Sequence, residues 1–157
     1  MGHFSVYLIP IVHLRDPLTI ETELNFIASK EAVTRLAERL NGCPGQHFAP
    51  RTLANIYFET PDNQLRRWDM GLRIRGIDNQ YEMTLKTRGQ TLGGLHQRPE
   101  YNVSLTANAL DIRLLPADVW PEGTDVDALQ QQLHPLFQTD FVREVWLITY
   151  AESEIEV

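Results

Sequence analysis

The sequence predicts an α+β domain in which a mostly antiparallel β-sheet curls into a barrel, with helices packed outside it. Three observations support this prediction. Segments that alternate polar and apolar residues dominate the chain, several follow one another with only short turns between, and two helical segments separate groups of them. No glycine-rich phosphate loop of the GxGxxG or GxxxxGK type is present, which argues against a doubly wound nucleotide-binding fold.

The first residues, 1–19, are treated as an N-terminal extension of unknown role, and residues 20–157 as the domain itself. Phe4–Leu8 has the composition of a strand. Pro10 and Pro17, however, interrupt any regular element, because proline lacks the backbone N–H that a helix or sheet needs.

The domain opens with a predicted strand over Ile20–Phe26 and a helix over Ser29–Leu40. Ser29 is a suitable N-cap, and apolar residues recur at helical spacing behind it. Gly42 is placed to adopt the left-handed conformation that often ends a helix. The following stretch, 42–50, has loop composition, and we expect His47 to be a solvated loop histidine.

The rest of the chain alternates strands with short connections. Asp78 and Asn79 supply a hairpin turn. The glycine-containing segment Arg88–Arg98 is a loop that either closes over a ligand or simply joins two strands. Pro135 is expected to end the second helix. The predicted strands are Leu53–Glu59, Leu72–Gly76, Gln80–Lys86, Pro99–Leu105, Phe141–Tyr150 and one beginning at Glu152; Asp125–Leu133 is helical, and Ala107–Pro116 is a short helix or an irregular turn.

Composition limits the class of protein. A chain of 157 residues corresponds to one domain, and its net charge of −7 argues against a nucleic-acid partner, which would need a basic face. It holds no apolar run of roughly 18 residues and no basic leader, so no membrane partner is expected. The lone Cys43 excludes an intramolecular disulfide and suits a reducing compartment, so we expect a cytoplasmic protein.

Charged residues alternate with apolar ones along several strands, and this is the main functional signal. Since successive side chains of a strand point to opposite faces, Glu21 and Glu23 share one face of their strand. Carboxylates of this kind suit a hard divalent cation, and cations on facing strands suit an anion with several charges, such as a triphosphate. Glu154 and Glu156 likewise share a face of the last strand. The candidate cations are Arg73, Arg75, Lys86, Arg98 and Arg143.

A simpler interpretation also fits this pattern. Alternating charges can mark the solvated face of an open antiparallel sheet, without any site.

Four motifs in order, IETELNF, NIYFETPDNQLRRWDMGLRIR, YEMTLK and HQRPEYN, resemble those of the CYTH superfamily, the triphosphate tunnel metalloenzymes. The likeness runs from Ile20 to about Val157 and is greatest for the bacterial inorganic triphosphatases. It implies an eight-stranded antiparallel barrel that encloses a tunnel. It also implies hydrolysis of inorganic triphosphate or another polyphosphate, assisted by Mg²⁺ or Mn²⁺.

The resemblance also assigns roles to residues. Metal would be held by Glu21 and Glu23, with Glu154 and Glu156 as further acidic candidates, and Glu100 would line the tunnel. The expected catalytic set is Glu21, Glu23, Lys86 and Glu100. The expected phosphate ligands are Arg73, Arg75, Lys86, Arg98 and Arg143.

Two departures from the family pattern leave alternatives open. Asn25 stands where the family has a lysine, and an amide cannot neutralise charge. The family's later acidic strands would lie beyond Val157, so we expect an incomplete barrel whose open edges favour self-association. One alternative function is a non-catalytic phosphate- or polyphosphate-binding module. Another is the adenylyl cyclase or thiamine triphosphatase activity of the same superfamily.

Overall fold

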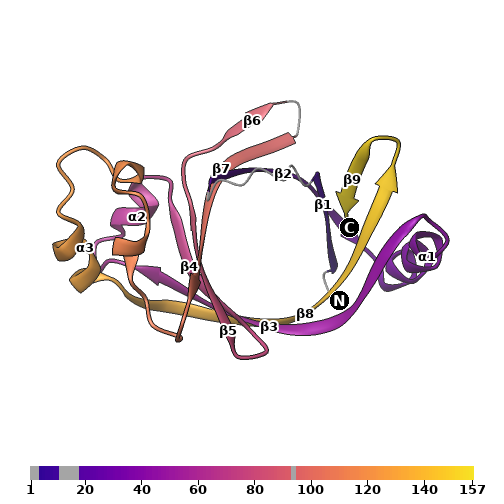
Figure 1. Ribbon diagram of the computed structural model, residues 1–157, viewed down its shortest axis with the longest axis horizontal. Coiled ribbons are helices and arrows are strands. Elements are labelled where there is room, and N and C mark those ends of the chain that lie inside the picture. Colours follow the sequence, from indigo (N-terminus) through magenta and orange to yellow (C-terminus); the bar gives the residue numbers. More distant parts are fainter. Residues whose placement is uncertain (1–3, 11–17, 93–94) are drawn as a thin grey trace.

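Strands curl into a ring in the computed structural model, which describes residues 4–10, 18–92 and 95–157, and short helices lie outside the ring (Figure 1). Within these ranges, no helix has the length and apolar character needed to cross a membrane. The elements are β1 (Phe4–Pro10), β2 (Leu18–Ala28), α1 (Lys30–Asn41), β3 (Gly45–Glu59), α2 (Gln64–Arg67), β4 (Gly71–Ile77), β5 (Gln80–Lys86), β6 (Gln90–Leu92), β7 (Leu95–Leu105), η1 (Ile112–Leu114), η2 (Ala117–Val119), α3 (Val126–Gln132), β8 (His134–Tyr150) and β9 (Ser153–Glu156).

Hydrogen-bonded strand pairs form a closed circuit. The strand order is β2-β1-β9-β8-β3-β4-β5-β7-β6, and β7 pairs in addition with β2, so every strand except β6 belongs to the ring. All pairs are antiparallel. The antiparallel barrel with helices outside is thereby confirmed.

Strand β1 lies between β2 and β9, where the sequence predicted open edges. Phe4–Leu8 pairs with Leu24–Ala28 of β2, while Ile9 and Pro10 pair with the end of β9. The β1–β9 junction has two residue pairs, fewer than any other pairing in the circuit. Self-association through open edges stays a prediction, and it now requires that β1 leave this position.

The apolar core lies on the outer side of the ring, between the sheet and the short helices. Leu72 of β4 and Met83 of β5 contact this layer from the sheet side, and Leu65 of α2 contacts it from outside. In β4, Leu72 and Ile74 are almost fully buried and alternate with less buried arginines. The buried members of the core are Leu65, Leu72, Met83, Leu85, Ile112, Leu115, Val119, Trp120 and Leu129.

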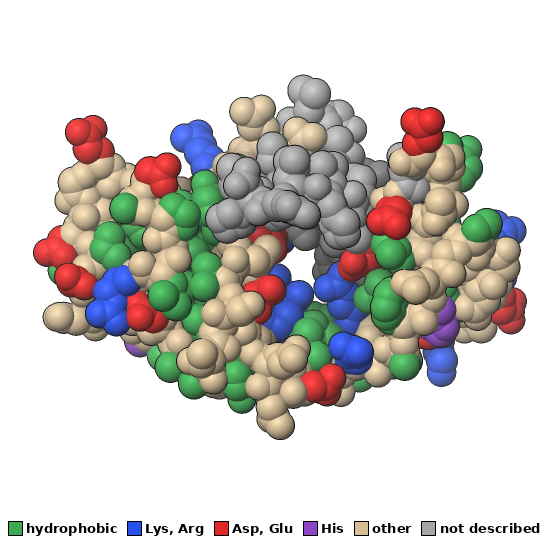
Figure 2. All heavy atoms as spheres, viewed as in Figure 1, with side chains coloured by type: hydrophobic (Ala, Val, Ile, Leu, Met, Phe, Trp, Pro, Cys, Tyr) green, Lys and Arg blue, Asp and Glu red, His purple; other side chains and the backbone are tan. Residues whose placement is uncertain are grey.

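The inner side of the ring is polar. Because strand residues alternate between faces, the residues between the core positions of β4 and β5 point the other way, toward the centre. Figure 2 shows Lys and Arg side chains gathered around a hollow at the centre of the molecule. The ring thus separates an apolar outer layer from a cationic interior.

Three local predictions were wrong, and long-range strand pairing explains the second and third. Gly42 has φ −88°, so it is not left-handed. Strand β3 begins at Gly45, so His47 is not in a loop; its ring stacks on Trp146 with 4.5 Å between centroids, and its Nε2 lies 2.7 Å from Glu144 Oε1. The partner strand β8 also starts earlier than predicted, at His134. Pro135 lies beside a register shift between β3 and β8, a place where sheets accept proline.

Other elements agree with the predictions to within a few residues. Ser29 caps α1 by accepting a hydrogen bond from Ala32 N, and Asp78 and Asn79 adopt the left-handed φ values of a hairpin turn. The segment around Arg88–Arg98 contains β6 and the start of β7, which pair as a hairpin.

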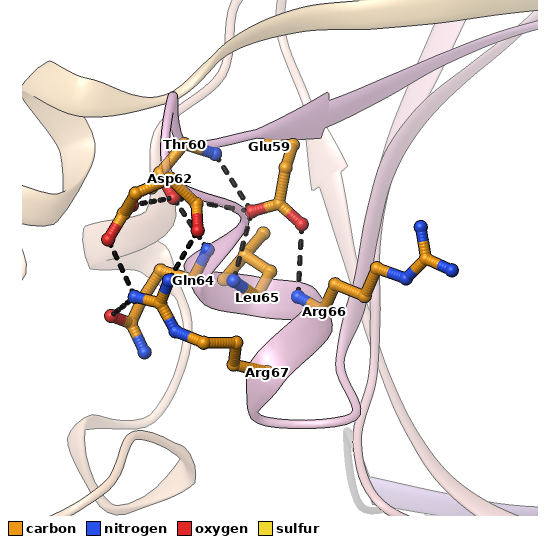
Figure 3. A network of polar contacts seen from close by, with 7 residues as sticks. All are labelled: Glu59, Thr60, Asp62, Gln64, Leu65, Arg66 and Arg67. Atoms are coloured by element: carbon orange, nitrogen blue, oxygen red, sulfur yellow. Dashed lines mark hydrogen bonds and ion pairs between the residues drawn. The ribbon is translucent and has the colours of Figure 1, made fainter.

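A buried carboxylate organises the connection between β3 and β4 (Figure 3). Glu59 is 6% exposed, and its Oε1 accepts hydrogen bonds from Thr60 N and Leu65 N at 2.8 and 2.9 Å. Its Oε2 accepts a third bond from Arg66 N at 3.0 Å. These backbone N–H groups belong to the turn and first residues of α2, which have no partners within the helix. Glu59 therefore fixes how α2 leads into β4.

Replacement of Glu59 by Gln is expected to lower the free energy of unfolding by about 2 kcal/mol, because one charged acceptor becomes an amide NH₂ facing backbone donors. Urea unfolding followed by circular dichroism measures the change. Asp62→Asn is the matched control, since Asp62 is exposed and contributes to the same turn. Equal stability of Glu59→Gln and the wild type would contradict this role.

Candidate active site

Three arginines from two strands form a cationic cluster inside the ring. Arg73 and Arg75 extend from β4, and Arg143 comes from β8, on the far side of β3. Burial, followed by the positive charges of Arg73 and Arg143, lowers the pKa of Arg75 to about 10. Arg75 thus keeps its charge at neutral pH in an environment that disfavours it.

Within the described residues, the arginine cluster has fewer acceptors and negative charges than it has donors and positive charges to pair. Arg143 forms an ion pair with Glu156 of β9. Among the described residues, however, the buried Nε of Arg73 has no hydrogen-bond partner. A buried donor without an acceptor costs about 1–3 kcal/mol. The lowered pKa of Arg75 adds a cost to folding at every pH below about 10, and this cost disappears only as the pH rises from there toward the ordinary arginine range. A bound anion would offset both costs.

Substitution of Arg73 by Met is expected to stabilise the unliganded protein by about 1 kcal/mol, because it removes a buried unpaired donor and a like charge. For a chain of this size this corresponds to a rise of roughly 2–4 °C in Tm. Tripolyphosphate should raise the Tm of the wild type and have much less effect on the variant. Differential scanning fluorimetry with and without tripolyphosphate measures both effects. A less stable variant that kept the full tripolyphosphate response would contradict the interpretation.

A second polar group crosses from β5 to β7. Lys86 Nζ lies 3.1 Å from Glu100 Oε2, and Glu100 is 8% exposed. Asn102 Nδ2 donates to Glu100 Oε1 at 2.9 Å, and Thr84 Oγ1 donates to Asn102 Oδ1 at 2.8 Å. The structure thus pairs two predicted catalytic residues, Lys86 and Glu100, and holds the carboxylate in place from its other oxygen.

Arg98 has a different environment from the other predicted phosphate ligands. Its Nε donates to the carbonyl oxygen of Thr87, and its Nη2 donates to the carbonyl oxygen of Asp69 and lies 3.3 Å from Asp69 Oδ1. None of these partners belongs to the arginine cluster. Its phosphate-binding role therefore stays a prediction, and an anion would have to displace these contacts.

The side chains of Glu21 and Glu23 lie outside the described part of the structure, so their metal-binding role also stays a prediction. Their backbone positions in β2 are opposite Arg98 and His96 of β7. Glu154 is exposed in β9, opposite Thr149. Where side chains are described, no three His, Cys, Asp or Glu residues come together.

Sequence reasoning missed Asn55 and Thr139. Asn55 is fully buried, accepts a hydrogen bond from Arg75 Nε at 2.9 Å and donates one to Thr139 Oγ1 at 3.2 Å. Alternation along Leu53–Glu59 does place Asn55 on the same face as Tyr57, so a signal existed. Nearby, Tyr57 stacks on Phe137 with 4.5 Å between ring centroids.

Comparison with known proteins identifies the family. Residues 19–157 match the CYTH domain. The chain belongs to the CYTH family. An inorganic triphosphatase of Haemophilus influenzae is 42% identical over 110 residues, which make up 67% of this chain and 29% of that protein. This chain thus spans less than a third of the length of that relative.

A solved structure of another protein shares the CYTH chain's fold. A Hippeastrum protein, described as revealing a dominant triphosphatase activity, superposes with a TM-score of 0.60 at 15% identity, over 99% of this chain and 77% of that one. A Pyrococcus horikoshii protein gives a TM-score of 0.47 at 12% identity, over 98% of this chain and 75% of that one. The family match and the Hippeastrum structure confirm the resemblance drawn from the four sequence motifs at the level of family and fold.

Proposed function

We propose that this CYTH chain binds inorganic triphosphate and hydrolyses one of its phosphoanhydride bonds. The observation that carries the proposal is the cluster of Arg73, Arg75 and Arg143. This cluster lowers the stability of the folded protein, because the buried Arg73 Nε is unpaired among the described residues and the pKa of Arg75 is lowered. Such a cluster suits an anion with several negative charges, because guanidinium groups bind phosphate oxygens in pairs. The Haemophilus influenzae relative, named an inorganic triphosphatase, supports this choice of anion.

Phosphoryl transfer needs little covalent chemistry from the protein, because positioning and charge neutralisation provide most of the acceleration. The role proposed for each residue therefore depends on where its charge lies relative to the phosphate chain. The arginines would hold the oxygens of the phosphate chain and stabilise the charge that develops on them. Lys86 would add a further cation from the adjacent β5. Glu100, which contacts Lys86 and is fixed by Asn102, would orient that ammonium group.

A divalent cation is part of the proposal, and the carboxylates carried by β2 and β9 are chemically suited to hold it. Carboxylate oxygens are the ligands that Mg²⁺ and Mn²⁺ prefer. Glu21 and Glu23 of β2 are separated from Glu154 and Glu156 of β9 by the single strand β1, so the two acidic strands run about 10 Å apart. Glu156 already pairs with Arg143, which leaves Glu21, Glu23 and Glu154 as the preferred ligands. When bound, the ion would neutralise phosphate charge and activate a water.

Release of phosphate from tripolyphosphate in the presence of Mg²⁺ or Mn²⁺ tests the function. The Arg73→Ala/Arg75→Ala double variant, purified in the same way, reports contaminating phosphatases. Calorimetric binding without release would select the non-catalytic module instead, an alternative that Asn25 favours because it removes a cation. Activity gained by Asn25→Lys would then attribute the defect to that position. If the chain neither bound tripolyphosphate nor released phosphate from it, the proposal would be refuted.

The stacked Tyr57–Phe137 pair favours a second candidate, hydrolysis of a triphosphate that carries an aromatic group. Phe137 is 50% exposed, and Tyr57 lies opposite Arg73 of β4 in the strand register. An aromatic ring could stack on this pair while its phosphates contact the arginines. A kcat/KM for ATP or thiamine triphosphate above that for tripolyphosphate, lost in Phe137→Ala, would select this candidate.

For its location we propose the cytoplasm, because the single free Cys43 is exposed and suits a reducing compartment.

A further inference from the structure

One buried amide links the arginine cluster to two other strands. Asn55 lies on β3, which is the strand between β4 and β8. Its register positions are opposite Arg75 on one side and Thr139 on the other. The same two residues are its hydrogen-bond partners, with Arg75 Nε donating to Oδ1 and Nδ2 donating to Thr139 Oγ1. The three residues thus form a row across three strands of the ring.

Arg75 determines the orientation of the Asn55 amide. A guanidinium N–H can only donate, so the amide oxygen must face the Arg75 Nε–H and the NH₂ group must point the other way. The hydroxyl of Thr139, which can donate or accept, accepts from Nδ2 and anchors that end of the amide. The exposed Thr139 thus helps to hold the fully buried Asn55 in place.

The contact determines which donors of Arg75 remain for a ligand. It uses the Nε–H, and among the described residues no hydrogen bond involves the Nη groups of Arg75. A guanidinium held through Nε retains the pair of Nη groups that grips a phosphate. Repulsion from Arg73 and Arg143 would otherwise push the Arg75 side chain away from the cluster. Asn55 opposes this displacement without adding a negative charge, which an aspartate in its place would do.

We propose that Asn55, anchored by Thr139, is a positioning residue that holds Arg75 ready for an anionic phosphate chain. This inference rests on the proposed function, because the anion is the one proposed above. It adds a residue pair that contacts no phosphate itself and acts only through Arg75. Both hydrogen bonds would be present before the anion binds. The conformational entropy of the Arg75 side chain would therefore be lost during folding and not during binding.

The test uses the intact chain with variants at both positions. Thr139→Val removes the accepting hydroxyl at an exposed site and preserves shape, while Thr139→Ser keeps the hydroxyl and serves as its matched control. Asn55→Ala removes both hydrogen bonds, and its melting curve establishes whether it folds. Two quantities are measured for each variant. One is the affinity for tripolyphosphate by calorimetry, and the other is the hydrogen exchange of the Arg75 Nε–H by ¹⁵N NMR, with the signal assigned by its disappearance in Arg75→Lys.

We expect a slowly exchanging Arg75 Nε–H in the wild type and in Thr139→Ser, and faster exchange in Thr139→Val and Asn55→Ala. Affinity for tripolyphosphate should fall about tenfold in the latter two variants. Unchanged exchange in a folded Asn55→Ala would overturn the positioning role, whatever the affinity. Faster exchange at unchanged affinity would overturn its link to anion binding. A wild type that shows slow exchange and no affinity for tripolyphosphate would instead refute the proposed function, and with it the purpose assigned to the contact.

Discussion

Arg75→Ala is expected to reduce kcat/KM for tripolyphosphate by at least about 100-fold, which corresponds to roughly 2.7 kcal/mol of transition-state stabilisation. Arg75 is partly buried inside the ring among like charges, and its pKa is lowered to about 10, so its charge is present at a site that excludes much of the solvent. A donor in such surroundings contributes more than one in water. Phosphate release under steady-state conditions measures the effect.

Arg113→Ala is the matched control for this prediction. Arg113 carries the same charge but lies in η1, outside the ring, where it pairs with Asp111 at 2.7 Å and is largely exposed. Its removal should leave activity within about twofold. Equal losses in the two variants would indicate a general effect of net charge, and retention of activity by Arg75→Ala would remove Arg75 from the site.

Glu21→Gln and Glu23→Gln are each expected to lower metal-dependent hydrolysis by at least about 100-fold, because a neutral amide is a poor ligand for Mg²⁺ or Mn²⁺ and the charge stabilisation from the ion is several kcal/mol. Binding of tripolyphosphate in the presence of a chelator should be retained, since the arginine cluster is unchanged. Activity is measured as a function of Mn²⁺ concentration. The variants should require more metal as well as showing a lower maximum.

Glu31→Gln is the control for the two glutamates. Glu31 lies in the first turn of α1, outside the ring, and is exposed. Its substitution should leave the metal dependence unchanged. If Glu21→Gln and Glu23→Gln behaved like this control, β2 would not supply metal ligands, and Glu154 on β9 would be the next residue to test.

Much of the fold and part of the site could be predicted from the sequence because both follow from side-chain alternation. A strand in which Leu72 and Ile74 alternate with Arg73 and Arg75 must bury one pair of residues and direct the other pair away. The same rule placed Lys86 on one face of β5, where the structure pairs it with Glu100. These statements need only the period of a strand.

Other features depend on partners far away in the sequence. Gly45 to Pro50 reads as a loop until it is paired with β8, about 100 residues later, and His47 is then stacked on Trp146. Residues 4–10 contain a proline at the last position, yet their place between β2 and β9 makes them a strand. Local composition is a weak guide where a long ladder supplies the hydrogen bonds.

The sequence by itself determined the family, the antiparallel sheet and the set of charges that alternate toward one face, because these depend on spacing along the chain. Only the tertiary structure decided that the pairing circuit closes through β1, that Arg98 is held by Thr87 and Asp69, and that Asn55 connects Arg75 to Thr139. The reason is physical: each of these features is a contact between strands, and contacts between strands depend on register and curvature, which no single segment contains.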